Sequence, residues 1–195
     1  KRNQRLRDDD PETRDHRNDD GLDSNNDQKT LNVTRSPTSP PPPFSRKRPT
    51  NQEIELKAQS YAWILVEDSA TLAGLWQHAM TTLRIKLTTL CSAPEISNLP
   101  ATLTYNLRSG GKPIVVVMDE NVVELDHEFD AVPVSSTTIR SRLMDNVGLR
   151  RAWLDRDLFF VLASAADVPK DEFCVTDIGK AGSTLQMIQK ILDAI

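Results

Sequence analysis

The first 50 residues of the chain contain too few hydrophobic side chains to form part of a folded domain. They include only five strongly hydrophobic side chains, those of Leu6, Leu22, Leu31, Val33 and Phe44. So little apolar surface cannot offset the conformational entropy that folding would remove. We therefore expect a disordered tail over residues 1–51 and a single globular domain over residues 52–195, which is long enough to bury a hydrophobic core.

Charge is distributed differently over these two parts. Residues 1–50 carry 11 basic and 9 acidic side chains, whereas residues 51–195 carry 13 and 19, so the net charge of −4 divides into +2 and −6. A surface that binds duplex nucleic acid is basic because it must neutralise phosphates. We therefore do not expect the folded domain to bind nucleic acid, and its acidity favours a protein partner with a basic surface.

The tail contains a proline-rich segment, "RSPTSPPPP", at residues 35–43. Ser36 and Ser39 each precede a proline, which predicts phosphorylation at both sites. The basic residues 46–48 fit a nuclear import signal. A plain linker is the alternative interpretation, because proline runs also act as stiff spacers.

Cysteine usage and hydropathy bear on where the protein works. Cys91 and Cys174 are far apart and form no disulfide framework, which indicates a reducing compartment. No apolar run is long enough to span a membrane, so we expect a nuclear or cytoplasmic protein. A secreted pathogen effector is the alternative: the sequence starts at Lys1 without a methionine, and "QRLR" at residues 4–7 resembles the host-targeting leaders of oomycete effectors.

Hydrophobic periodicity begins near residue 52. The expected strands lie at residues 61–67, 102–108, 113–119, 131–134, 157–164 and 172–178, and the expected helices at about 69–90, 135–148 and 183–195. Gly110 and Gly111 favour a hairpin between the second and third of these strands. The order predicts an α/β or α+β fold, in which three helices pack on a mixed sheet of about five to six strands.

The segment "DENVVELDHEFDAV" at residues 119–132 is strongly acidic. If residues 122–131 are extended, Glu124, Asp126, Glu128 and Asp130 project from one face, and His127 lies with apolar neighbours on the other. The four carboxylates then predict a docking edge for a basic protein. The alternative is a solvated edge strand, which charge protects from aggregation.

"VSSTTIR" at residues 134–140 resembles the "ISSTxIR" signature of the HxGH nucleotidyltransferases. In that family the hydroxyls and the helix N-terminus contact nucleotide phosphates, so the resemblance implies anion contacts from Ser135, Ser136, Thr137 and Arg140. The His-x-Gly-His motif of the family has no counterpart in this sequence. Helix capping is the alternative role for the same hydroxyls.

No complete nucleophile–base pair, metal cluster or phosphate loop is present in the sequence. We therefore predict no catalytic residues, no metal ligands and no cofactor. The favoured function is a non-enzymatic protein-interaction module, either an adaptor or a regulatory subunit. The alternatives are a nucleotide-binding, transferase-like domain centred on residues 135–140, and the secreted effector.

Overall fold

The structure, a computed structural model, describes residues 49–164, 171–179 and 182–195. Its strands are β1 (Ala62–Val66), β2 (Leu87–Leu90), β3 (Ile114–Met118), β4 (Asn121–Leu125), β5 (Ala131–Ser135), β6 (Leu158–Leu162) and β7 (Cys174–Asp177). Its helices are α1 (Asn51–Ala58), α2 (Ala70–Thr82), α3 (Ala93–Ser97), α4 (Leu99–Ser109), α5 (Ser136–Met144), α6 (Val147–Leu154) and α7 (Thr184–Ala194).

Five of the strands form one sheet in the order β2-β1-β3-β6-β7, and every neighbouring pair is parallel. Val66 of β1 lies opposite Met118 of β3, which lies opposite Leu162 of β6, so the three central strands end level with one another. β3 and β6 are buried along their whole length, as expected for parallel strands covered on both faces. The predicted α/β class is confirmed.

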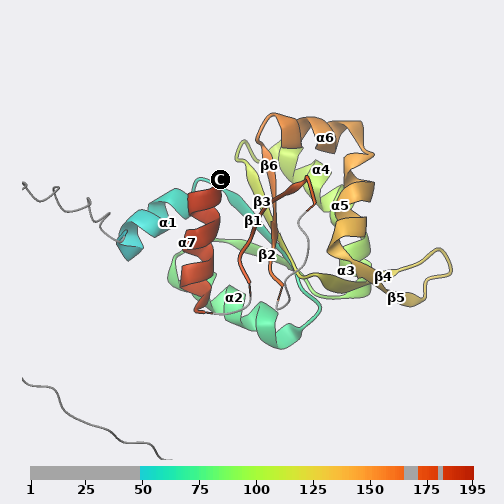
Figure 1. Ribbon diagram of the computed structural model, residues 1–195, viewed down its shortest axis with the longest axis horizontal. Coiled ribbons are helices and arrows are strands. Elements are labelled where there is room, and N and C mark those ends of the chain that lie inside the picture. Colours follow the sequence, from blue (N-terminus) through green and yellow to red (C-terminus); the bar gives the residue numbers. More distant parts are fainter. Residues whose placement is uncertain (1–48, 165–170, 180–181) are drawn as a thin grey trace, which may run out of the picture. The chain divides into compact units, whose positions relative to one another are not determined.

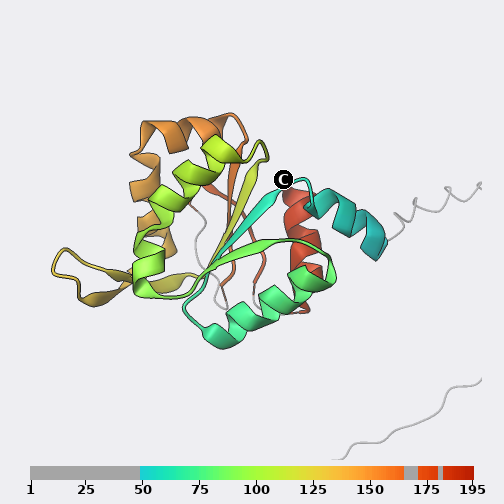
Figure 2. The same ribbon diagram turned by 180° about the vertical axis from the view of Figure 1, so that it is seen from behind.

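Helices cover both faces of this sheet (Figure 1; Figure 2 from behind). On one face, α1, α2 and α7 pack against alternate residues of the strands, such as Trp63, Val115 and Val161. On the other face, α3 to α6 pack against the residues between them, such as Ile64 and Val116. The sequence predicts three helices, whereas the described residues form seven, most of them short. None of them is long and apolar enough to cross a bilayer.

Antiparallel pairing is confined to β4 and β5, which form a separate hairpin. The prediction of one extended segment over residues 122–131 is wrong, because the chain reverses at residues 126–130. There the Asp126 carboxylate accepts hydrogen bonds from the N–H groups of Glu128 (2.8 Å) and Asp130 (2.9 Å). His127 lies at the exposed tip of the hairpin rather than in the core.

The predicted helix over residues 69–90 ends at Thr82 and is followed by strand β2. At its end the N–H of Arg84 donates to Thr81 O (3.0 Å) and that of Ile85 donates to Met80 O (2.8 Å). This is the Schellman arrangement that ends helices, with Arg84 at φ 54° in the position that glycine usually occupies. Because this helix ends without a glycine, the sequence predicted a longer helix than the one that forms.

The predicted hairpin between residues 102–108 and 113–119 is also wrong, because the first segment belongs to α4. Pro100 lies in the first turn of that helix, where proline needs no amide hydrogen bond. Leu99 and Leu103, four residues apart, are both buried. The expected helix over residues 135–148 is divided into α5 and α6, because the Asn146 side chain accepts from two amides and begins a new helix.

Candidate functional site

The carboxyl ends of β1 and β3 form the point where the sheet changes winding direction. From β1 the chain passes to β2 on one side, and the remaining strands are added on the other side. Ligands in open parallel sheets of this order bind in the crevice outside such a switch point. The candidate site is therefore built from the residues that follow these two strands.

The residue after each central strand is held by the hydrogen bonding of the sheet itself. The N–H of Asp119 donates to Val66 O (3.0 Å), and the N–H of Ala163 donates to Met118 O (2.8 Å). Glu67, after β1, is fixed in the same way to Leu90 O (3.2 Å). The backbone at this edge is thus set by the strands rather than by flexible loops.

Three carboxylates meet at this edge. One oxygen of each of Glu67, Asp68 and Asp119 lies within 4.8 Å of the corresponding oxygens of the other two. Glu67 is buried, Asp119 is half-buried and Asp68 is exposed, so the cluster is open to solvent on one side. Several carboxylate oxygens in one place repel each other and suit a hard divalent cation such as Mg²⁺.

Local hydrogen bonds orient two of these carboxylates. Glu67 Oε1 accepts from the N–H of Ser69 (3.1 Å), just before α2 begins. Asp119 Oδ1 accepts from the N–H of Glu120 (2.7 Å). Glu67 also lines a cavity of about 100 Å³ beside Trp76 and Met187, so the cluster adjoins one of the hydrophobic cores.

Further polar residues lie along the same edge. Ser164, two residues beyond the end of β6, is buried. Cys91 follows β2, and its thiol has a raised pKa, first because of burial and then because the carboxylates of Glu95, Glu67 and Asp68 disfavour the thiolate. The charges of the cluster therefore also influence the pKa of the Cys91 thiol.

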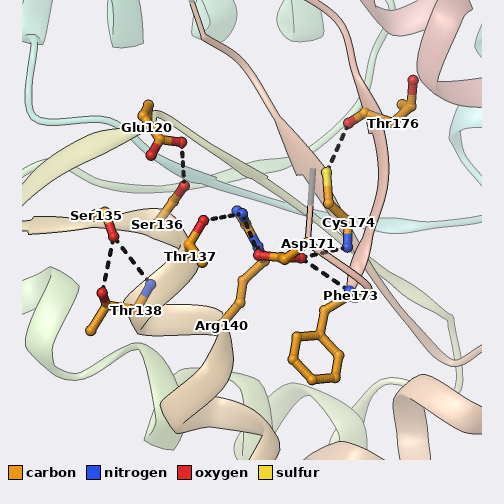
Figure 3. A network of polar contacts seen from close by, with 10 residues as sticks. All are labelled: Glu120, Ser135, Ser136, Thr137, Thr138, Arg140, Asp171, Phe173, Cys174 and Thr176. Atoms are coloured by element: carbon orange, nitrogen blue, oxygen red, sulfur yellow. Dashed lines mark hydrogen bonds and ion pairs between the residues drawn. The ribbon is translucent and has the colours of Figure 1, made fainter. Parts of the chain in front are cut away.

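The predicted anion-binding residues lie where β5 enters α5, and Figure 3 shows them. Ser135 caps the helix by accepting from the N–H of Thr138 (3.2 Å). The hydroxyl of Ser136 donates to Glu120 Oε2 (3.0 Å). Thr137 Oγ1 accepts from Arg140 Nη2 (3.2 Å). All three hydroxyls are thus engaged within the chain.

Arg140 is completely buried and forms an ion pair with Asp171. Its Nε and Nη2 lie 2.8 and 2.7 Å from Asp171 Oδ2, whereas Nη1 has no hydrogen-bond partner among the described residues. Asp171 Oδ1 accepts from the N–H groups of Phe173 and Cys174, which fixes the entry to β7 (Figure 3). Anion binding by Ser135, Ser136, Thr137 and Arg140 stays a prediction.

The four acidic residues predicted as a docking edge do not form one row. Glu124 is buried and paired with Arg142 of α5, and Asp126 organises the hairpin turn. Glu128 and Asp130 are exposed at the hairpin tip. Partner binding at this edge stays a prediction that falls mainly on these last two residues. The predicted phosphorylation sites Ser36 and Ser39 lie outside the described residues.

The carboxylate cluster was not predicted from the sequence, although a signal for it is present there. "WILVED" and "VVVMDE" are apolar strands that run directly into acidic residues. In a parallel sheet such strands deliver those residues to one edge. The mistaken hairpin made the strand that ends at Asp119 antiparallel to its neighbour, and this concealed the convergence.

Comparison with known proteins yields fold neighbours only. No protein-family model matches the sequence, and no curated protein matches it. Among solved structures, the chain is similar to a CheY-like response regulator receiver domain protein from Methanospirillum hungatei JF-1, with 17% identity and a TM-score of 0.46 over 69% of this chain and 93% of that one.

Two further solved structures show the same kind of similarity. The chemotaxis response regulator CheY4 of Vibrio cholerae is 8% identical, with a TM-score of 0.44 over 69% of this chain and 99% of that one. The monomethylamine corrinoid protein of Methanosarcina barkeri is 13% identical, with a TM-score of 0.40 over 74% of this chain and 63% of that one. These similarities concern the arrangement of strands and helices.

Proposed function

We propose that this domain is a regulatory protein-interaction module, and that a phosphoryl group carried by Asp119 sets its state. Glu67, Asp68 and Asp119 would together hold a divalent cation beside that group. The observation that carries the proposal is the meeting of these three carboxylates at the switch point of a parallel sheet. Two of the solved structures above are named as response regulators, which is the general role proposed here.

Asp119 is the best placed of the three carboxylates to act as the acceptor. It follows β3, the central strand of the sheet, and it is only half-buried. One of its oxygens accepts from the N–H of Glu120 (2.7 Å), which orients the carboxylate. Ser164, at the end of the neighbouring strand β6, puts a hydroxyl-bearing residue on the same edge.

The proposed step is nucleophilic attack by a carboxylate on phosphorus. An oxygen of Asp119 forms a bond to the phosphorus of a small donor such as acetyl phosphate, and the bond from phosphorus to the acetyl oxygen breaks. Acetate leaves with the electron pair, and Asp119 becomes an acyl phosphate. The bound cation would supply the charge that offsets the phosphoryl oxygens.

Contacts around Asp119 offer a route from this site to the surface. Glu120, the next residue, accepts hydrogen bonds from both the N–H (2.7 Å) and the hydroxyl of Ser136. Ser136 is the first residue of α5, and Arg142 of the same helix pairs with Glu124 in the β4–β5 hairpin. A change of charge at Asp119 would therefore reach α5 and the hairpin.

The output of the domain would be altered binding of a protein with a basic surface. Glu128 and Asp130 at the hairpin tip are the acidic residues that we propose it contacts, since they are exposed. We further propose an intracellular location, nuclear or cytoplasmic, and the basic residues 46–48 would serve as a nuclear import signal.

The direct test is to incubate the full chain with acetyl phosphate and Mg²⁺ and to measure its intact mass. We expect the addition of one phosphoryl group, which requires Mg²⁺ and is lost in Asp119→Asn. Asp157→Asn is the matched control, because Asp157 is an exposed aspartate at the opposite edge of the sheet. Equal labelling of the wild type and Asp119→Asn would disprove the proposed acceptor.

A further inference from the structure

We infer that the opposite, amino-terminal edge of the sheet carries a second binding site, which takes a small phosphate-bearing anion. A cavity of about 520 Å³ lies beside the first residues of β1 and the entry to β2. Its volume falls in the range that holds metabolite-sized ligands. Three cationic side chains, those of Arg84, Lys86 and Lys112, line it, and among the described residues no carboxylate does.

The three cations come from two connections of the chain. Arg84 and Lys86 lie between α2 and β2, and Lys112 lies between α4 and β3. Within the described ranges none of the three has an acidic partner at ion-pair distance. Their local excess of positive charge is unusual in a domain whose own charge is −6, and it would concentrate anions in this cavity.

Neutral groups add hydrogen-bonding capacity to the same cavity. Lys112 Nζ donates one bond to Gln59 O (2.8 Å), which leaves two of the three ammonium protons for a ligand. Asn106 and Thr88 also line the cavity, and the half-buried Tyr61 supplies an aromatic wall. Several convergent donors around an accessible hollow suit the oxygens of a phosphate group.

Arg84 reaches the cavity from the turn that ends α2. The residue occupies the left-handed position of the Schellman motif at φ 54°, where any side chain is disfavoured relative to glycine. Its side chain supplies one of the three cations of the cavity.

This site is separate from the carboxylate cluster. β1 alone places five residues between the two edges, roughly 13 Å of extended chain. The ligand classes are also opposite, because the carboxyl edge repels phosphate unless a cation is bound. Binding at the amino edge therefore needs no divalent cation, and this property distinguishes the two sites in solution.

The test is to titrate the full chain calorimetrically with pyrophosphate and with ATP, in EDTA to remove divalent cations. We expect saturable binding of both, weakened at least about fivefold in Arg84→Gly and in Lys86→Gln, since each loses one of three cations. Because glycine relieves the left-handed strain, Arg84→Gly should keep its melting temperature or raise it by roughly 1–3 °C.

Arg156→Gly is the matched control. Arg156 occupies the same position of a second Schellman arrangement, after α6, at φ 63°, and it lies outside this cavity. Its replacement should change the melting temperature in the same direction and leave the affinity for pyrophosphate unchanged. Asp119→Asn should also bind pyrophosphate normally, so failure of the proposed function would not affect this result.

The titrations with pyrophosphate and with ATP both test the inference. Equal affinities for pyrophosphate and ATP would show recognition of phosphate alone, and a higher affinity for ATP would add a contribution from Tyr61; either result supports the site. Lack of saturable binding by both compounds would overturn it. So would unchanged affinity in Arg84→Gly and Lys86→Gln, or binding of an acidic peptide such as polyglutamate in place of both phosphate compounds.

Discussion

The two edges of the central sheet differ in charge and in how their side chains are held. At the carboxyl edge, Glu67 and Asp119 follow strands directly and accept hydrogen bonds from neighbouring amides. At the amino edge, Arg84 and Lys86 are exposed on the connection that precedes β2. Short carboxylates on a fixed backbone can define a coordination geometry, whereas long exposed cations mainly supply an attractive field.

A parallel sheet thus keeps carboxylates and cations at opposite edges of one small domain. The five strands of the central sheet all point the same way. The residues that follow these strands therefore share one edge, and the residues that precede them share the other. The carboxyl edge should therefore be selective and the amino edge permissive.

The largest expected effect concerns the buried anchor beside the carboxyl edge. Arg140→Ala leaves Asp171 without its ion-pair partner and should destabilise the domain by about 3–5 kcal/mol, because a buried charge loses its compensation. Urea unfolding measures this cost. Arg142→Ala is the control, since its half-exposed ion pair with Glu124 should contribute only about 1 kcal/mol. Equal losses would show that burial of Arg140 does not matter.

The second prediction concerns Mg²⁺ and thermal stability. Mg²⁺ at about 100 times its Kd should stabilise the wild-type domain by about 2.7 kcal/mol, because it binds the folded state alone. Asp119→Asn should lose most of this effect. Without Mg²⁺ the same variant should be slightly more stable than the wild type, since one of three mutually repelling carboxylates is removed. Thermal melts with and without Mg²⁺ measure both changes, and a variant that is less stable without Mg²⁺ would contradict the repulsion.

The third prediction distinguishes the edges by their response to salt. Raising NaCl from about 0.05 to 0.5 M should weaken pyrophosphate binding at the amino edge roughly tenfold, because exposed cations are screened. Lys112→Gln should reduce this dependence on salt, since it removes one of the cations. Calorimetry over a salt series measures the slope. An affinity that does not change with the NaCl concentration would show that charge does not drive binding there.

The smallest expected effect is at Cys91. Burial raises the pKa of its thiol, and the Glu95 carboxylate raises it further, so at pH 8 its thiolate fraction should be below that of a free cysteine. Glu95→Gln should lower the pKa and speed alkylation by iodoacetamide a few-fold. Cys174, which is buried and also has a raised pKa, serves as the slow internal reference. A slower reaction in Glu95→Gln would have the wrong sign.

Much of the fold could be predicted from the sequence because several elements carry strong local signals. The apolar runs that form β1, β3 and β6 are continuous since both faces of the sheet are covered. The last helix begins with a capping box between Ser183 and Gln186 and has one apolar face. The prediction failed at Thr82, where Arg84 ends a helix without glycine, and at residues 102–108, which lie in a helix with Pro100 in its first turn.

The candidate site was less predictable because it depends on strand direction. Asp119 lies about 50 positions from Glu67 and Asp68, and only parallel pairing of β1 with β3 brings the three together. The cations of the amino edge are similarly dispersed along the chain. By contrast, the acidic residues at 124–130 are close together in the sequence and predicted a single docking edge. In the structure the Asp126 turn and the Glu124–Arg142 pair divide them. Density along the sequence was a poor guide to proximity in the fold.

The most direct measurement for the carboxyl edge is calorimetric titration of the full chain with Mg²⁺ in phosphate-free buffer. We predict one bound ion per chain, an affinity reduced at least about tenfold in both Asp68→Asn and Asp119→Asn, and no change in Asp157→Asn. Absence of binding by the wild type at millimolar Mg²⁺, or equal affinities in all four proteins, would contradict a cation site built from Glu67, Asp68 and Asp119.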